Sequence, residues 1–196
     1  MLKGAIARRY AEAMFEIARR QNSIDRTLED IKGIAELFSQ RKLAYLLKEP
    51  KVPAQRKEST LRENVGPHVL PTSLNLALLI VQRELVDVMP AIAREFEQFV
   101  LDYRNQAVAT VTSAAQLDES QQAVVKRMLE RQTGKTIIMH TQIDPNILGG
   151  IIARVGDQVI DSSVRYRLHA LHQDLLSGVA SNALDFSPES LASAGK

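Results

Sequence analysis

Residues 148–171 read LGGIIARVGDQVIDSSVRYRLHAL, and this stretch carries the strongest fold signal in the chain. Residues 151–155 alternate with the two-residue period of a half-buried strand. Gly156 and Asp157 form a two-residue hairpin loop, because glycine readily takes the positive φ that such turns require. Residues 158–161 then supply the returning strand. The sequence therefore predicts a β-hairpin in its last third.

The length of the loop decides which residues face each other across the hairpin. Arg154 is predicted to pair with Val159. Two residues further from the turn, Ile152 is predicted to pair with Asp161. One of the two serines that follow can cap a helix. The apolar face of that helix is predicted to consist of Val164, Leu168, Leu171 and Leu175.

This stretch resembles the C-terminal signature of the delta subunit of bacterial F-type ATP synthases, a family that includes the mitochondrial oligomycin sensitivity-conferring protein. The signature runs from a diglycine through a strand, a Gly-Asp turn and a strand ending in aspartate to a Gly-Ser step into a helix. The matching residues are Gly149, Gly150, Gly156, Asp157, Asp161, Ser163, Arg165 and Leu168. Ser162 stands where the family usually has glycine, so its backbone angle is the point to check.

Two further segments carry the same resemblance. Residues 7–13 read ARRYAEA, which is similar to the opening helix of the family. Residues 111–114 read VTSA and are followed by Leu117, which is similar to the strand and helix start that join the family's two domains. The resemblance extends over residues 3–176. It implies a non-catalytic stator subunit that links the catalytic head to the peripheral stalk, so that ion-driven rotation is coupled to ATP synthesis.

Composition restricts the classes of protein that fit. The chain has 196 residues and no cysteine, which excludes disulfides and thiolate metal sites. A net charge of +2, aromatic residues at 5% and the absence of tryptophan argue against a nucleic-acid partner. The longest apolar run, Leu76 to Val81, is far shorter than the roughly 20 residues that cross a bilayer. We therefore expect contact with a membrane only indirectly, through partner proteins.

The hydrophobic pattern predicts an α+β protein with two domains. Residues 1–105 are predicted to form an antiparallel six-helix bundle. Its helices are expected at residues 3–20, 24–38, 41–48, 53–64, 72–84 and 87–103. Thr72 or Ser73 is expected to cap the fifth of these helices. Residues 106–176 are predicted to form a small α/β domain with a short sheet and two helices. The first of these helices is expected at residues 117–132, with Ala123, Val124, Met128 and Leu129 as candidate inward residues. Residues 177–196 are rich in serine and alanine and are expected to be mostly disordered.

The first helix carries two adjacent apolar stripes, although a helix on the outside of a bundle needs one. The first stripe consists of Ile6, Tyr10, Ala13 and Ile17. The second stripe consists of Ala7, Ala11, Met14 and Ala18. The fifth helix is apolar on every side from Leu76 to Val81. Two explanations stay open: both helices are central in the bundle, or they flank a groove for a partner's amphipathic helix.

The family resemblance favours the groove, which in the family holds the N-terminal helix of one alpha subunit of the head. The implied groove residues are Ala7, Tyr10, Ala11, Met14, Leu74, Ala77, Leu78 and Val81. Under this interpretation, Ala11→Arg or Ala77→Glu should abolish head binding and leave the fold nearly intact. Melting or loss of helicity on the same scale would favour the central-helix explanation.

For the second domain, the resemblance implies binding to the C-terminal ends of the stalk's b subunits. Its glycines and Gly-Asp turn are expected to shape the backbone, and the last helix is expected to contact the stalk through Arg165, Arg167 and Leu168. The family also implies a peripheral position on the cytoplasmic face of the bacterial cell membrane.

No motif in the chain indicates catalysis. His169 and His172 are three residues apart on a helix, a spacing that can hold a metal, but no acidic or cysteine ligand stands at a telling distance from them. There is no phosphate-binding loop ending in Lys-Ser or Lys-Thr, and no nucleophile elbow. We expect no cofactor, no metal, no small-molecule substrate and no nucleic acid. The alternatives are a nucleic-acid or ribosome-associated module and an unrecognised hydrolase.

Overall fold

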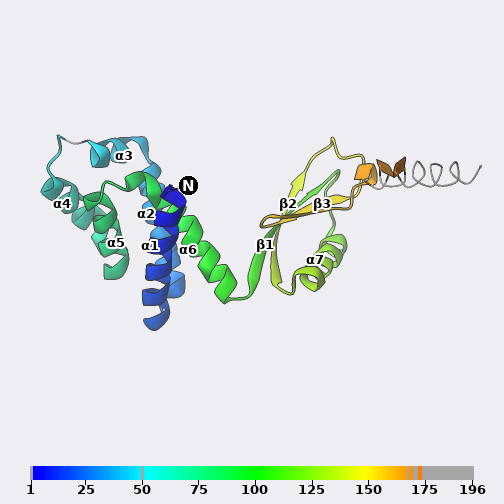
Figure 1. Ribbon diagram of the computed structural model, residues 1–196, viewed down its shortest axis with the longest axis horizontal. Helices are drawn as coiled ribbons and strands as arrows, with labels where there is room; N and C mark the ends of the chain where they lie inside the picture. Colours follow the sequence, from blue (N-terminus) through cyan, green and yellow to red (C-terminus); the bar gives the residue numbers. More distant parts are fainter. Residues whose placement is uncertain (1, 50, 167, 170–171, 174–196) are drawn as a thin grey trace, which may run out of the picture. The chain divides into compact units, whose positions relative to one another are not determined.

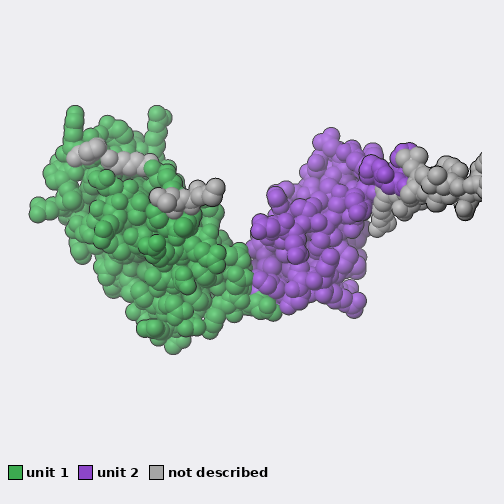
Figure 2. All heavy atoms as spheres, in the orientation of Figure 1, with its two compact units in different colours: residues 1–105 green, residues 106–196 purple. Residues whose placement is uncertain are grey.

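The structure is a computed structural model that describes residues 2–49, 51–166, 168–169 and 172–173. The chain divides into two compact units, residues 1–105 and residues 106–196 (Figure 2). The first unit is helical and the second contains the sheet (Figure 1). The protein is therefore α+β, and each unit has a hydrophobic core of its own.

Short loops connect the helices of the first unit. They are α1 (Leu2–Arg20), α2 (Ile24–Ser39), α3 (Arg41–Lys48), α4 (Ala54–Asn64), α5 (Pro71–Gln82) and α6 (Met89–Tyr103), with single 3₁₀ turns η1 (Gly66–His68) and η2 (Val86–Val88). Helix α6 packs against both α1 and α2, while α5 packs against α4 and α2.

Helix α6 supplies the centre of this core. Met89, Ile92 and Phe96 follow one another at helical spacing, and all three are fully buried. Phe15 of α1 meets α6 through aromatic contacts, with its ring centroid 6.2 Å from that of Phe96. It also lies 5.7 Å from the ring of Tyr103 in an edge-to-face arrangement. These aromatic contacts join Phe15 of α1 to two positions on α6.

A buried carboxylate holds the start of α5 in place. Asp30 on α2 accepts the backbone N–H of Leu70 at 2.7 Å. Arg26, one turn earlier, donates to the carbonyl oxygen of His68 at 2.6 Å and lies 3.4 Å from the Asp30 carboxylate. Because the Asp30 side chain is only 3% exposed, its charge-assisted bond from the Leu70 N–H is little weakened by water.

The start of α5 differs from the prediction. Capping by Thr72 or Ser73 was expected, whereas the helix begins at Pro71 and Leu70 occupies the cap position without a side-chain bond. Proline at the first helical position has its φ already set for a helix, and this outweighs the capping preference of serine. Ser73 is fully buried, and its hydroxyl has no hydrogen-bond partner in the described part of the chain.

The second unit contains β1 (Gln106–Ser113), α7 (Glu119–Thr133), β2 (Thr136–Ile143), β3 (Ile151–Val155) and β4 (Gln158–Asp161). The four strands form one mixed sheet in the order β2-β1-β3-β4. Strands β1 and β2 are parallel, with α7 as their connection, and the other neighbours are antiparallel. Buried residues of α7 and the sheet form the core: Ala109, Val111, Val125, Leu129, Ile137, Ala153 and Val155.

The hairpin prediction is confirmed in detail. Val155 pairs with Gln158 around the two-residue loop, Arg154 with Val159, and Ile152 with Asp161. Gly156 has φ +57°, while Asp157 is not among the residues with positive φ. A positive φ at the first loop residue alone is the pattern of a type II′ turn.

Helix α7 has clear ends but a different inward face from the predicted one. Asp118 accepts the N–H of Gln121 at 2.8 Å, and the Gln121 side chain accepts the N–H of Asp118 at 3.1 Å. Gly134 closes the helix in a left-handed conformation. The sequence suggested Ala123, Val124, Met128 and Leu129 as inward residues. Of these only Leu129 is buried, together with Val125, so the prediction for the other three is wrong.

Candidate functional site

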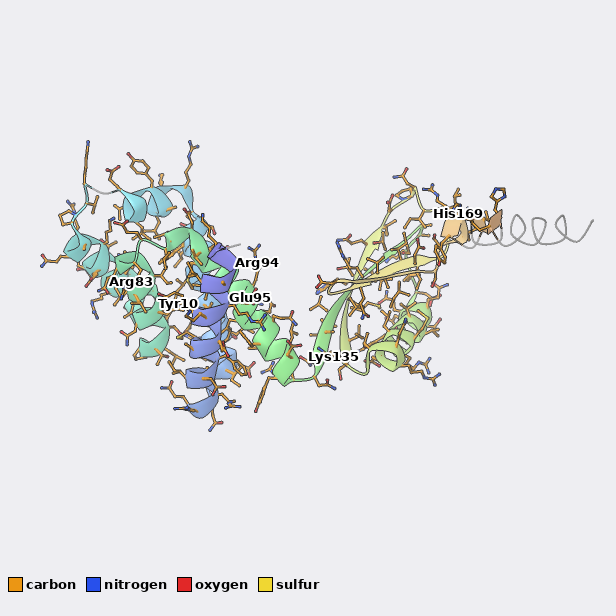
Figure 3. All side chains as sticks on the ribbon, in the orientation of Figure 1. Tyr10, Arg83, Arg94, Glu95, Lys135 and His169 are labelled. Carbon is orange, nitrogen blue, oxygen red and sulfur yellow. The ribbon has the colours of Figure 1, made fainter. Side chains whose placement is uncertain are left out.

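The two apolar stripes of α1 lie in different surroundings. The second stripe, Ala7, Ala11, Met14 and Ala18, is buried in the core. In the first stripe, Ile6 and Tyr10 are half-buried at the edge of the core, Ala13 is exposed, and Ile17 is 40% exposed. Tyr10 is labelled on α1 in Figure 3. Helix α1 therefore buries one stripe in the core and leaves the other partly exposed, most of all at Ala13 and Ile17.

The apolar run of α5 is explained mainly by burial. Leu76, Ala77, Leu78, Ile80 and Val81 are all buried, so core contacts surround most of the helix. Leu79 is 37% exposed and Leu74 is half-buried. The part of α5 that a partner can reach is thus narrow.

These exposures divide the residues predicted to form the groove. The structure buries Ala7, Ala11, Met14, Ala77, Leu78 and Val81, and leaves Tyr10 and Leu74 half-buried. For the six buried residues the explanation by core packing is sufficient. Helices α1 and α5 each contact α2. A groove between α1 and α5 remains a prediction. The residues that would line it are Tyr10, Leu74 and the accessible residues Ile17 and Leu79.

The expected effect of the two test substitutions changes for the same reason. Ala11 and Ala77 are both fully buried, so an arginine or glutamate side chain at either position would enter the core. An unpaired charge in a core is strongly destabilising. We therefore no longer expect Ala11→Arg or Ala77→Glu to leave the fold nearly intact, and neither variant separates binding from folding.

In the second unit, the diglycine is required by close backbone approach. A Cβ on Gly150 would lie 2.5 Å from the carbonyl oxygen of Ser162, and Gly150 has φ +82°. A Cβ on Gly149 would lie 3.3 Å from Val164, and the carbonyl of Gly149 accepts the N–H of Val164 at 3.0 Å. The diglycine thus allows the chain after β4 to pack directly against the start of β3.

The aspartate and serine of the signature cap the helix that follows. Asp161 accepts the N–H of Ser163 at 2.8 Å, and the Ser163 hydroxyl accepts the N–H of Tyr166 at 3.2 Å. The Ser163 hydroxyl, followed by the Ser163 backbone N–H, lowers the pKa of Asp161 below its ordinary value of 3.8. Ser162 is not among the residues with positive φ, so serine in place of the family's glycine strains nothing.

The start of the last helix exposes apolar surface. Residues 164–166, 168–169 and 172–173 are helical. Val164 is 41% exposed and Leu168 57%, and Arg165 is also exposed. Arg167, predicted to face the stalk, lies outside the described residues, as do Leu171, Leu175 and the tail from residue 177. The predicted apolar face of this helix is therefore open to a partner wherever the structure describes it.

The histidines do not build a metal site in the described residues, where no group of three or more His, Cys, Asp or Glu side chains could hold a metal ion. His169, labelled in Figure 3, and His172 are both exposed. Among the described helices, none is both long and apolar enough to cross a membrane.

The chain consists of a helical unit and a small α/β unit. Each unit exposes apolar surface on a helix, which is typical of proteins that bind partner proteins through such surfaces. The chain belongs to the ATP synthase delta (OSCP) subunit family, whose sequence model matches residues 6–175. Members of this family are structural, non-catalytic subunits that act in the stator of the complex.

Individual relatives agree with this assignment. ATP synthase subunit delta of Desulforudis audaxviator (strain MP104C) is 35% identical over 176 residues, covering 89% of this chain and 97% of that protein. Subunit delta of Desulforamulus reducens is 33% identical over 178 residues, covering 90% and 98%. Among solved structures, a chain of the Toxoplasma gondii mitochondrial ATP synthase hexamer shares the fold, with a TM-score of 0.59 at 24% identity, covering 90% of this chain and 98% of that chain.

Proposed function

We propose that this chain clamps the catalytic head of an F-type ATP synthase to its peripheral stalk. Residues 1–105, as an antiparallel six-helix bundle, bind the N-terminal helix of one alpha subunit of the head. Residues 106–176 bind the C-terminal ends of the b subunits. The chain then lies on the cytoplasmic face of the bacterial membrane and reaches that membrane only through the complex.

The task of such a clamp is mechanical. Ion flow turns a rotor inside the head, and without an anchor the head would turn with it. A clamp must stay bound through many cycles, so slow dissociation matters more than fast association. Two binding sites on one chain add to the lifetime of the assembly, since release of one site leaves the other attached.

The exposed stripe of α1 is the observation that carries the head contact. Ile6, Tyr10, Ala13 and Ile17 repeat at i, i+4, i+7 and i+11, which is the spacing of one helix face. The core buries the neighbouring stripe completely, whereas this face is only partly used: Ile6 and Tyr10 pack at the edge of the core, and Ala13 and Ile17 stay exposed. An amphipathic helix is the partner that such a face accepts, and Leu79 on α5 adds a second accessible apolar side chain.

The experiment is a calorimetric titration of the full chain with a peptide of the alpha subunit's N-terminal helix from the same organism. We expect one-to-one binding with a negative heat-capacity change, because apolar surface is buried. Ile17→Asp should weaken this binding, since a carboxylate would then face the apolar partner.

Tyr45→Asp on α3 is the matched control, because Tyr45 is 71% exposed and lies outside the stripe. This control should bind as the wild type does. Equal affinities of the wild type and Ile17→Asp, with unchanged circular dichroism, would contradict the assignment of α1.

A further inference from the structure

The outer side of α7 bears apolar residues that the core does not use. Val124 is 58% exposed and Met128 is 39% exposed. They are four residues apart and so lie one above the other on the helix. Val125 and Leu129, one position later in each case, face the sheet and are buried. Helix α7 therefore has one apolar pair for its own core and a second pair that nothing in the described residues covers.

Arginines flank the exposed pair. Arg127 and Arg131 are also four residues apart, and with Val124 and Met128 they form an i, i+3, i+4, i+7 face. Within the described part of the chain, neither arginine has a carboxylate within ion-pairing distance. The nearby Glu130 is engaged elsewhere, because it accepts the backbone N–H of Ile137 at 3.2 Å.

Some cations of the first unit do have carboxylate partners. There Lys32 bonds to Glu97 at 2.6 Å, and Arg104 pairs with Asp25. The outer face of α7 thus presents two guanidinium groups without an acidic partner, beside two apolar side chains. A planar guanidinium suits bidentate pairing with a carboxylate.

We propose that this α7 outer face, defined by Val124, Arg127, Met128 and Arg131, docks an acidic amphipathic helix contributed by the b subunits of the stalk. The proposal rests on the function proposed above and assigns a place and a chemistry to its stalk contact. The docked helix places apolar side chains on Val124 and Met128 and carboxylates on the two arginines. A second copy of this chain fits poorly, since a self-complementary contact would bring like charges together.

The test is a titration of the full chain with the soluble C-terminal part of the b subunits from the same organism. Val124→Asp combined with Met128→Asp should weaken binding at least about tenfold, because both apolar contacts are lost. Arg127→Glu combined with Arg131→Glu should weaken binding by a similar factor and reduce its dependence on salt. All four positions are exposed, so circular dichroism should stay unchanged.

The open face of the sheet provides matched controls. Val159 is 57% exposed, almost as much as Val124, and its cross-strand partner Arg154 is exposed as well. Val159→Asp and Arg154→Glu repeat the same chemical changes on a different surface of the same unit. Both controls should bind the b segment as the wild type does.

Each alternative outcome has a clear meaning. If the wild type does not bind the b segment, the proposed function fails, and this docking site fails with it. If the wild type binds and the α7 variants bind equally well, the docking site alone is overturned. Weakening by Val159→Asp instead would move the contact to the open sheet face. Sedimentation of a wild-type dimer that the α7 substitutions dissociate would make the occupant a second copy, which also overturns the proposal.

Discussion

Replacing Gly150 by alanine tests whether the diglycine is a steric requirement. An added Cβ would lie 2.5 Å from the Ser162 carbonyl oxygen and 2.9 Å from the Ser163 Cα. Both neighbours are backbone atoms, so no side-chain rotation can relieve the contacts. The φ of +82° is a further cost for any residue that has a Cβ.

These two effects add to a substantial loss of stability. A left-handed backbone costs a residue with a Cβ about 1–2 kcal/mol. Forcing an extra methyl group into a close-packed site costs about 1–3 kcal/mol more. We therefore expect Gly150→Ala to lower the free energy of unfolding of the second unit by about 2–5 kcal/mol.

Two other glycines provide matched controls for the same substitution. Gly156 has φ +57° with no atom within 4 Å of the added Cβ, so Gly156→Ala should cost only the backbone term, about 1–2 kcal/mol. Gly33 lies exposed inside α2 with open space around it. Alanine there should stabilise the first unit by about 0.5–1 kcal/mol, because alanine is the better helix former.

The assay is urea denaturation of the full chain followed by NMR signals assigned to each unit, since two units need not unfold together. In the first unit, we expect Gly33→Ala to be more stable than the wild type. In the second unit, we expect Gly156→Ala to be more stable than Gly150→Ala. A cost for Gly150→Ala no greater than that for Gly156→Ala would refute the steric argument.

Three further predictions follow from the geometry. Ala11→Arg should unfold the first unit or lower its melting temperature strongly, because Ala11 is fully buried, and calorimetry that finds wild-type stability would contradict the assigned core. Asp30→Ala should cost about 2 kcal/mol by leaving the Leu70 N–H unpaired, whereas the exposed neighbour change Glu29→Ala should cost less than about 0.5 kcal/mol in the same denaturation series. The lowered pKa of Asp161 means that its carboxylate stabilises the folded second unit above the unfolded pKa, and that this contribution is lost as the pH falls through the folded pKa. Asp161→Asn should therefore destabilise that unit at neutral pH, with a difference from the wild type that shrinks as the pH falls below 3.8 and through the folded pKa. A difference independent of pH would exclude the carboxylate as its source.

Local signals explain which parts of the fold could be predicted from the sequence. The hairpin was predicted to the level of its pairs, because a two-residue loop and the alternation of residues 151–155 leave one register. The diglycine was correctly expected to shape the backbone, and Ser163 is one of the two serines expected to cap the last helix. The steric reason for Gly150, the approach of Ser162, depends on a distant segment and is visible only in three dimensions.

Helix phase was the main failure, and its cause is the same in each helix. In α7, Val124 and Val125 are adjacent, as are Met128 and Leu129, so two apolar pairs at i and i+4 lie side by side. Periodicity cannot decide which pair faces the sheet. In α1 the two stripes pose the same ambiguity, and residues proposed for a groove, such as Ala11, proved to be core residues. In α1, the more accessible face is the stripe that contains Ile17, and the sequence already showed this stripe.

The most direct test of the clamp is whether both partners bind one chain at once. The full chain would be mixed with the alpha subunit's N-terminal helix and the soluble b segment, and the masses of the complexes measured by sedimentation. We predict a ternary complex, with each affinity changed less than about twofold by the other partner, because the two proposed sites lie on separate units. Displacement of one partner by the other would contradict the account.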